Sequence, residues 1–333
     1  MAVVGVGHLG QHHARVCAEL DGAALVGVSD TDEAQGREVA RRHGVEFYPC
    51  CEDLLDKVDA VTVATPTVAH PAVAKAFLER GIPALVEKPL AASPGEAEDI
   101  VEAADRGGAI LQVGHIERFN PAVRAVLGCN VRPVFIESHR MSPFRFRSVD
   151  VGVVFDLMIH DIDLARRFVG AEVEGLDAAG AAVISEHEDI ASARLAFANG
   201  AVANITASRV SMESMRKTRL FSREGYYTVD CAAGTAARLR KGDAFRAAER
   251  KLAGASPKAL AELKDVDFTS LVEADRLPVE PVEPLMAEIE SFAQAVRTGA
   301  EPEVTGRDGL AAVKIAADVV GQIRERLKRL GVR

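Results

Sequence analysis

Glycines at three positions near the start of the chain have the spacing of a turn that can hold phosphate groups. They belong to the sequence GVGHLG, residues 5–10, which follows an apolar segment and precedes an amphipathic one. The first glycine would permit a tight turn, the second would let a pyrophosphate approach the backbone, and the third would let a helix and a strand pack closely. We predict that the turn binds a dinucleotide through Gly5, Gly7, His8, Leu9 and Gly10.

An acidic residue follows at the distance that such a turn requires. Asp30 ends the next apolar segment, 20 residues after Gly10. A carboxylate at this position accepts hydrogen bonds from the ribose hydroxyls of the adenosine. Asp32 adds negative charge that would repel a 2′-phosphate, and the nearest arginine in the sequence is Arg37. The pattern therefore favours NAD over NADP as the cofactor.

Two further motifs, TPTVAH at residues 65–70 and EKP at residues 87–89, each follow a segment expected to be a strand. Ligands of open α/β sheets bind beyond the carboxyl ends of the strands, so both motifs should border the cofactor site. For the histidine of the first motif, packing at the start of the following helix is an alternative role. We predict cofactor contacts from Thr65, Pro66, His70, Glu87 and Lys88.

The elements that would position these residues alternate between strand and helix through the first third of the chain. Short segments rich in Val and Ala are separated by amphipathic ones, which is typical of a parallel sheet with helices on both faces. The expected strands are Ala2–Val6, Ala24–Asp30, Ala60–Ala64, Ala84–Glu87 and Ile110–Val113, and the expected helices are His12–Leu20, Glu33–Arg42, Pro71–Arg80 and Pro94–Asp105. We predict a doubly wound α/β Rossmann domain over residues 1–117.

After residue 117 the pattern changes to strands with few helices between them. Asn199 and Gly200 join two of these strands as a hairpin turn would. The expected strands are Val134–Ser138, Ala181–Ile184, Ile190–Ala196, Ala201–Ser208 and Tyr226–Val229, and the expected helices are Gly152–Val169, Arg246–Lys264, Leu285–Thr298 and Gly309–Arg329. We predict an α+β domain over residues 118–333 with a large, mostly antiparallel open sheet, and C-terminal helices that can pack back on the first domain.

The composition indicates the class of protein. The chain has 333 residues, enough for two domains, and 48% of them are hydrophobic, which is typical of a folded globular protein. No apolar run reaches the ~18 residues of a membrane span. The N-terminus lacks the features of a signal peptide, so we expect a cytoplasmic protein without membrane contact. The first strand leaves no lead-in residue, which is compatible with a natural start upstream of Met1.

Charge and metal-ligating residues disfavour two further kinds of site. With 40 Lys and Arg against 49 Asp and Glu the net charge is −9, which argues against nucleic-acid binding. The five cysteines form no CxxC pair and are expected to be free thiols. His8, His12 and His13 cluster near the glycine turn, but no carboxylate or thiol set completes a ligand sphere. No metal is predicted.

Over the whole chain, these motifs resemble the Gfo/Idh/MocA oxidoreductase superfamily. The resemblance rests on the EKP after a Rossmann strand, on the D-x-x-x-H-x-x-D pattern of residues 156–163, and on the C-terminal segment from residue 283 to residue 309. It implies an NAD-dependent enzyme that oxidises a secondary hydroxyl group. It also implies a dimer or tetramer assembled through the open sheet face of the second domain.

By this resemblance Lys88 and His160 carry the catalysis, with Asp156 in support. Oxidation of an alcohol requires removal of the hydroxyl proton as hydride leaves. A lysine can stabilise negative charge that develops on the oxygen, and a histidine can accept the proton near neutral pH. Asp156 and His160 are four residues apart and would be neighbours on an α-helix, so the carboxylate could orient the imidazole.

The segment GHIERFNPA, residues 114–122, resembles a narrower branch, the UDP-N-acetylglucosamine 3-dehydrogenases. That resemblance implies oxidation of the sugar's C3 hydroxyl to a ketone, which an aminotransferase then converts toward a 2,3-diamino sugar for lipid A. Arginines of the loop at residues 141–147 could grip a diphosphate, or could simply be solvated. We predict substrate contacts from His115, Arg118, Asn120, Arg145 and Arg147.

Two other functions remain open. The chain could oxidise a free sugar, an inositol or another nucleotide sugar, although VGVV at residues 151–154 replaces the glycine-rich segment usual in the broad family. It could also be a non-catalytic regulator that senses NAD. Retention of Lys88, Asp156 and His160 argues against the regulator.

Overall fold

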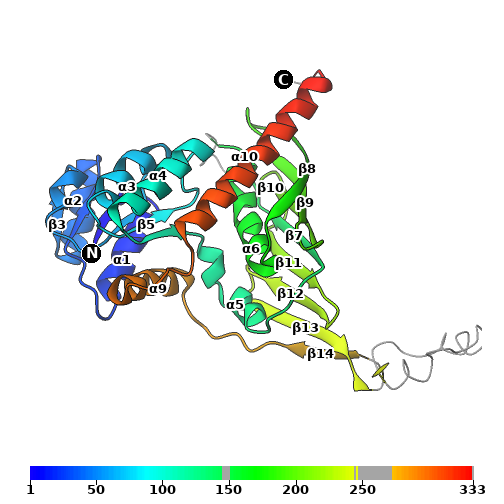
Figure 1. The fold of residues 1–333 in the computed structure, drawn as a ribbon. Coiled ribbons are helices and arrows are strands. Elements are labelled where there is room, and N and C mark those ends of the chain that lie inside the picture. Colours follow the sequence, from blue (N-terminus) through cyan, green and yellow to red (C-terminus); the bar gives the residue numbers. More distant parts are fainter. Residues whose placement is uncertain (145–150, 244, 247–271, 332–333) are drawn as a thin grey trace, which may run out of the picture.

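The computed structural model describes residues 1–144, 151–243, 245–246 and 272–331. Figure 1 shows two layered regions, each built around one β-sheet. The first sheet has six strands and lies within residues 2–114, and the second has eight strands and lies within residues 135–276. The predicted fold class, a Rossmann-type α/β unit followed by an α+β unit, is confirmed.

All strand pairs of the first sheet are parallel, in the order β3-β2-β1-β4-β5-β6. The direction of winding reverses between β1 and β4, and ligands of such sheets bind at the carboxyl ends of the strands beside that point. All strands except β3 are fully buried, which explains their nearly continuous apolar sequences. The strands are β1 (Ala2–Val4), β2 (Gly27–Ser29), β3 (Glu46–Tyr48), β4 (Val61–Val63), β5 (Ala84–Glu87) and β6 (Leu111–Gly114).

The two helices nearest the predicted site begin slightly earlier than expected. Helix α1 (Gly10–Glu19) starts at the last glycine of the turn, and α3 (His70–Leu78) starts at the histidine of the TPTVAH motif. A short 3-10 turn, η2 (Thr67–Ala69), leads into α3. Both helices therefore begin directly at the carboxyl ends of β1 and β4.

The other helices of this sheet begin and end at capping residues. Helix α2 (Glu33–His43) begins after Asp32, whose side chain accepts a hydrogen bond from a backbone N–H of the first turn, and it ends at Gly44 in the left-handed region. Helix α4 (Pro94–Gly107) begins after Ser93, which caps it in the same way. Asp32 is thus a cap as well as a negative charge beside Asp30.

The second sheet has the order β14-β13-β12-β11-β7-β10-β9-β8. Its strands pair antiparallel except for β7 with β10, which are parallel. The predicted hairpin turn joins β9 to β10, with Gly200 at a positive φ of 85°. The strands are β7 (Phe135–Met141), β8 (Val173–Ala181), β9 (Ile190–Phe197), β10 (Val202–Ser208), β11 (Met215–Phe221), β12 (Tyr226–Asp230), β13 (Thr235–Lys241) and β14 (Val272–Arg276).

The structure corrects one predicted strand. The strand expected at Ala181–Ile184 is wrong, because β8 ends at Ala181 and a loop follows. The carboxylate of Asp189 accepts hydrogen bonds from the backbone N–H groups of Val183 and Ile184, at 2.8 and 2.6 Å. Those donors are therefore satisfied by a side chain rather than by a neighbouring strand.

Strands β3, β8, β11, β13 and β14 are absent from the strands expected from the sequence. In β11 and β13 the cationic sequences MRKTRLF and TAARLRK hide the alternation of buried and exposed positions. The helix expected at Arg246–Lys264 lies outside the described residues except for its first position. The helix expected at Gly152–Val169 is present as a π-helical turn, η4 (Val154–Met158), followed by α6 (Ile159–Val169).

The two C-terminal helices return to the first sheet (Figure 1). Helix α9 (Pro284–Thr298) packs against α1 and buries apolar residues beside β1. Helix α10 (Gly306–Arg329) begins with a capping box formed by Thr305 and Asp308. It packs against α4 and β6 of the first region and against α6 and β8 of the second. Helix α10 therefore joins the two regions.

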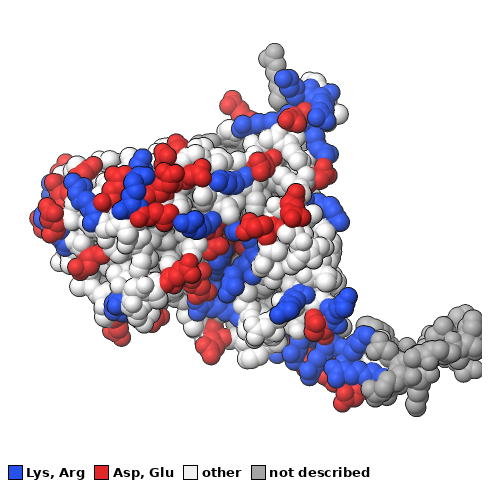
Figure 2. Space-filling view, viewed as in Figure 1, with Lys and Arg blue, Asp and Glu red and all other residues white. Residues whose placement is uncertain are grey.

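None of the helices in the described ranges combines the length and apolarity that crossing a membrane requires. On the face shown in Figure 2, acidic and basic side chains are interspersed over the first region. Lys and Arg gather at the end of the second sheet that carries β13 and β14.

Candidate active site

The glycine turn has an open space where a phosphate would bind. Gly5 has a positive φ of 83°, and a Cβ there would lie 2.7 Å from the backbone nitrogen of Thr65. A Cβ on Gly10 would overlap the carbonyl oxygen of Gly5. A Cβ on Gly7 would meet no atom within 4 Å, although this residue lies at the N-terminus of α1. Two glycines are therefore required by packing, and the third leaves a cradle at a helix N-terminus.

Asp30 fixes this turn from the end of β2. One carboxylate oxygen accepts a hydrogen bond from the backbone N–H of Val6 at 2.7 Å, and the other accepts from the N–H of Asp32 at 2.8 Å. The side chains of His8 and Leu9 are exposed at the rim of the turn. An open cradle with a carboxylate at the end of the neighbouring strand fits a dinucleotide with a free ribose 2′-hydroxyl.

His70 joins the two loops that follow β4 and β5. Its Nε2 lies 3.0 Å from the carbonyl oxygen of Thr65, and its Nδ1 lies 3.1 Å from that of Pro89. Burial lowers the pKa of His70, and the neighbouring carbonyl groups oppose that effect. The ring is 1% exposed, so it positions these loops from the interior, whereas Pro66 is exposed beside the turn.

Glu87 points into the protein and links the EKP motif to α1. Its carboxylate lies 2.9 Å from Nε2 of His13, and both side chains are buried. Burial would raise the pKa of Glu87, but the hydrogen bond and charge of His13, together with Lys88, bring that pKa below its ordinary value. The buried pair therefore ties the helix of the glycine turn to the strand that presents Lys88.

Lys88 reaches from the first region to the π-helical turn of the second. Its ammonium group donates a hydrogen bond to the main-chain oxygen of Asp156 at 2.8 Å, and the carboxylate of Asp156 lies 3.9 Å away. Burial lowers the pKa of Lys88, the charges of Asp156 and Glu87 oppose this, and Arg140 lowers that pKa further. The lysine of the first region and the helix of the second thus meet directly.

The π-helical turn changes the expected pairing of Asp156 and His160. In the described structure no hydrogen bond joins these two residues, and Nδ1 of His160 has no partner. Asp156 instead faces Lys88. A π-helical turn has i→i+5 bonding, so side chains four apart do not align as they would in an α-helix. Asp156 is therefore placed to hold the lysine rather than the histidine.

His160 lies in surroundings that keep its imidazole neutral. Its pKa lies well below the ordinary value because of burial and because of the positive charges of Lys88, Arg140 and Arg216. The side chain nevertheless remains partly exposed. A neutral imidazole near an ammonium group can accept a proton from a hydroxyl group that the lysine holds.

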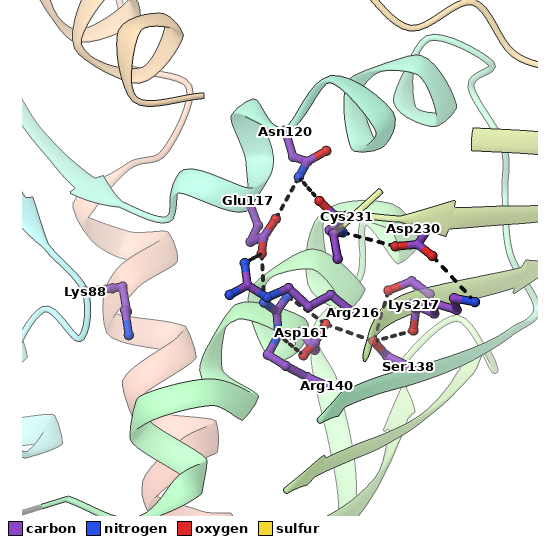
Figure 3. A network of polar contacts seen from close by, with 12 residues as sticks. Lys88, Glu117, Asn120, Ser138, Arg140, Asp161, Arg216, Lys217, Asp230 and Cys231 are labelled. Carbon is purple, nitrogen blue, oxygen red and sulfur yellow. Dashed lines mark hydrogen bonds and ion pairs between the residues drawn. The ribbon is translucent and has the colours of Figure 1, made fainter. Parts of the chain in front are cut away.

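Behind these residues lies a buried network of charges (Figure 3). The guanidinium of Arg140 donates to Asp161 at 2.7 and 3.2 Å and to Glu117 at 2.7 Å. Ser138 donates to Asp161 at 2.9 Å. These side chains come from β7, from α6 and from a 3-10 turn, η3 (Ile116–Phe119). The network fixes α6, and with it His160, against the sheet.

Two of the predicted substrate residues, Arg118 and Asn120, form hydrogen bonds with other residues of the protein. Arg118 binds Asp163 through two hydrogen bonds of 2.8 and 2.6 Å and also contacts Asp308 at 3.2 Å. Asn120 accepts a hydrogen bond from the backbone N–H of Ala122 and so caps α5 (Pro121–Leu127). Both side chains are buried and bind other groups of the protein.

Of the other predicted substrate residues, only His115 lies within the described residues. His115 is 1% exposed, burial lowers its pKa, and neither ring nitrogen has a hydrogen-bond partner in the described structure. Arg145 and Arg147 lie outside the described residues. Among the residues that are described, no group of three or more His, Cys, Asp or Glu is placed to hold a metal ion.

Glu288 is a buried carboxyl group without a hydrogen-bond partner for either oxygen. It lies on α9, and its main-chain oxygen accepts a hydrogen bond from Gln112 at 3.1 Å. Burial and the negative charge of Glu87 raise the pKa of Glu288 well above its ordinary value. The negative charge of one buried carboxylate disfavours ionisation of a second one nearby, and here the pKa of Glu288 is raised while that of Glu87 is lowered.

Several residues of the site go beyond the sequence prediction: His13, Glu117, Arg140, Asp161, Arg216 and Glu288. The sequence pattern could have identified one of them, Glu288. Glu288 lies three residues after Leu285 and four before Phe292, on the apolar face of α9, so helical periodicity places a carboxyl group in the core. The other positions depend on contacts between segments far apart in the sequence.

Comparisons with known proteins show which family the chain belongs to. A model described as an oxidoreductase family with an NAD-binding Rossmann fold matches residues 1–115, and a Gfo/Idh/MocA C-terminal domain model matches residues 123–236. The chain is 38% identical over 229 residues to a UDP-N-acetylglucosamine 3-dehydrogenase from Acidithiobacillus ferrooxidans, which covers 68% of this chain and 72% of that protein. The chain belongs to the Gfo/Idh/MocA oxidoreductase family.

Other relatives agree with the family and differ in substrate. This Gfo/Idh/MocA protein aligns with a UDP-N-acetylglucosamine 3-dehydrogenase structure from the same bacterium over 98% of both chains, with a TM-score of 0.85 and 31% identity. It is 32% identical to a scyllo-inositol 2-dehydrogenase (NAD(+)) from Bacillus subtilis, over 63% of this chain and 67% of that protein. The predicted oxidoreductase class and the NAD cofactor are confirmed.

Replacing Gly7 with Ala should weaken NAD binding without unfolding the protein. The added methyl group meets no protein atom within 4 Å, but it enters the cradle where the pyrophosphate binds. We expect at least a ~10-fold higher Kd for NADH, or about 1.4 kcal/mol, and a nearly unchanged Tm. Calorimetric titration checks the first and thermal unfolding the second.

The matched control is Gly95→Ala, since a Cβ on Gly95 also meets nothing within 4 Å but lies on α4. It should bind NADH like the wild type. Equal NADH affinity of the Gly7→Ala protein and the control would contradict the placement of the cofactor.

Replacing Glu288 with Gln should remove a pH dependence of stability. Folded protein keeps this carboxyl protonated, whereas the unfolded chain releases the proton above its ordinary pKa of 4.5. The contribution to stability is complete below that value and is lost as pH rises toward the raised folded pKa, at about 1.4 kcal/mol per pH unit. Urea unfolding between about pH 6 and pH 8 measures the slope.

Glutamine cannot ionise, so the Glu288→Gln protein should have the smaller slope and the higher stability at the alkaline end. Glu290→Gln, at an exposed position of the same helix, should keep the wild-type slope. Identical slopes in wild type and Glu288→Gln would show that Glu288 is ionised in the folded protein.

Proposed function

We propose that this enzyme oxidises a secondary hydroxyl group of a nucleotide sugar, specifically the C3 hydroxyl of UDP-N-acetylglucosamine, to a ketone. The observation that carries the proposal is the 2.8 Å hydrogen bond from Lys88 to Asp156, four residues before His160. This bond joins the strand end that carries the ammonium group in the first region to the helical segment that continues to the imidazole in the second. The 38% identity to a UDP-N-acetylglucosamine 3-dehydrogenase supports the choice of substrate.

Lys88 and His160 would divide the work on the hydroxyl group. Lys88 turns its ammonium from the carbonyl of Asp156 to the reacting oxygen and stabilises the negative charge that develops there. His160, neutral in this site, takes the hydroxyl proton. When bound in the glycine turn, NAD supplies the acceptor for the hydride that leaves the carbon.

Asp156 and Arg140 would act through these two residues. The carboxylate of Asp156, 3.9 Å from the ammonium group, holds the Lys88 side chain in place. The charge of Arg140 lowers the pKa of both Lys88 and His160, so it favours a neutral base and an anionic oxygen in the same place. Arg140 itself is held by Glu117 and Asp161 and does not need the substrate.

A free polyol is the second candidate substrate. The similarity to a scyllo-inositol 2-dehydrogenase favours it, because the same lysine and histidine chemistry would oxidise a ring hydroxyl without a nucleotide. The two candidates differ in charge: a nucleotide sugar carries a diphosphate and an inositol does not. A substrate panel therefore separates them.

The test is to incubate the enzyme with NAD and UDP-N-acetylglucosamine and to follow NADH by absorbance. Because the ketone product can be reduced back, an aminotransferase that consumes it should be included. We expect NADH and an aminated nucleotide sugar, and little NADH with myo- or scyllo-inositol. Turnover of inositol alone would overturn the nucleotide-sugar assignment.

The Lys88→Met protein should bind NADH normally and lose about 100- to 1000-fold in kcat, the range seen when one charge-stabilising donor is removed. Lys75→Met is the matched control, because Lys75 lies on α3 and pairs with Asp99 at 3.8 Å. The control should turn over like the wild type. A kcat for Lys88→Met within a few fold of the control would remove Lys88 from the reaction.

We also propose a homo-oligomer that forms through the outer face of the second sheet. Helices α5, α6 and α10 pack against the other face (Figure 1). Three aromatic side chains cluster on the outer face. The ring centroids of Phe135 and Phe221 are 5.7 Å apart, and those of Phe221 and Tyr226 are 4.9 Å apart. Light scattering after size exclusion should give a dimer or tetramer, and Phe221→Glu should dissociate it. A wild-type monomer at micromolar concentration would contradict this interface.

A further inference from the structure

Two arginines lie directly opposite each other on neighbouring strands of the second sheet. Arg216 on β11 pairs in register with Arg140 on β7. The pairs that follow along the same face, Ser138 with Thr218 and Ile136 with Leu220, are buried beneath α6. Arg216 therefore lies on the inner face of the sheet, near the start of β11, where its side chain is exposed.

The two guanidinium groups differ in how their donors are used. Arg140 is buried and donates to Asp161 and Glu117, as described above. Arg216 is 56% exposed, and in the described part of the chain its guanidinium has one ion-pair contact, with Glu117 at 3.9 Å, beyond hydrogen-bond length. Figure 3 shows its side chain extending from β11 toward the side on which Lys88 lies.

This pairing costs free energy unless an anion compensates it. Like charges directly opposite on antiparallel strands destabilise a sheet. The carboxylate of Glu117 accepts a hydrogen bond from Arg140 at 2.7 Å and lies 3.9 Å from Arg216, so it offsets the repulsion but makes no direct hydrogen bond with Arg216. The charge of Arg216 also reaches the reaction site, because it lowers the pKa of both Lys88 and His160. A cation with uncommitted donors thus lies beside the place where the sugar would react.

We propose that Arg216 binds the diphosphate of the nucleotide-sugar substrate and thereby selects nucleotide sugars over free polyols. This inference rests on the proposed function and adds a residue to it. A guanidinium presents paired N–H donors that match phosphate oxygens, and its charge-assisted hydrogen bonds are the strong ones. A sugar held at one end by Lys88 and at its phosphorylated end by Arg216 would have a fixed orientation.

The neighbouring cations have other partners. Lys217 lies 3.5 Å from Asp230, and Arg219 lies 2.9 Å from Glu137, both on the outer face of the sheet. Arg118 is buried against Asp163. Arg219 is therefore a matched control for Arg216: it lies on the same strand with a similar exposed fraction, 47%, but on the opposite face.

The experiment measures kcat and KM for UDP-N-acetylglucosamine with wild type, Arg216→Ala, Arg216→Lys and Arg219→Ala. We expect Arg216→Ala to raise KM by about 10- to 100-fold, as removal of a charge-assisted hydrogen bond does, with kcat changed much less. Arg216→Lys should recover part of the loss. NADH affinity should be the same in all four proteins, which shows that the variants are folded.

A second readout uses UDP alone, titrated by calorimetry into each protein saturated with NADH. Its affinity should fall in Arg216→Ala but not in Arg219→Ala, and the difference should shrink at high salt. If wild type uses the nucleotide sugar while Arg216→Ala matches Arg219→Ala in KM and UDP affinity, this assignment is overturned and the proposed function stands. If wild type binds no UDP and oxidises only free polyols, both are overturned.

Discussion

The site depends on one hydrogen bond between two regions of the chain, from the Lys88 ammonium to the main-chain oxygen of Asp156. Each end of this bond is held by separate structure. On one side, the buried pair of Glu87 and His13 fixes the strand end that presents Lys88 to the helix of the glycine turn. On the other side, a π-helical turn presents the carbonyl group, and α6 continues from it to His160. These contacts link the glycine turn, Lys88 and His160 to one another through groups of the protein itself.

The charges around this bond explain why Lys88 can keep its proton while His160 stays neutral. A buried ammonium group would normally lose its proton, but the negative charges of Asp156 and Glu87 oppose that loss. The histidine receives no such help, and the neighbouring cations keep it neutral. A charged donor and an uncharged base can therefore coexist in this site, which is the combination that the proposed removal of a hydroxyl proton requires. The raised pKa of Glu288, in contrast, favours a neutral carboxyl group in the buried interior.

Much of this could be predicted from the sequence, because local patterns determine it. The glycine turn, the strand ends and the caps Asp32 and Ser93 are properties of short segments. The predictions failed where a side chain replaced a backbone partner, as Asp189 does after β8. The pairing of Asp156 with His160 assumed an α-helix, and nothing in DLMIH signals the π-helical turn. The Arg140–Asp161 pair joins a strand to a helix 21 residues later, which no local pattern specifies.

The turn that follows the first sheet is held against α6 and α10 by the buried side chain of Arg118, and this bears on how the enzyme binds its substrate. Arg118 connects η3 to Asp163 of α6 and to Asp308 at the start of α10. Removing one partner of a buried ion pair typically costs about 3–5 kcal/mol, so domain motion that separated these groups would be expensive. The lysine and the histidine are then already convergent before the substrate arrives. In the proposed mechanism, less binding free energy is then needed to assemble the site, and more is available for distinguishing substrates through charged side chains such as Arg216.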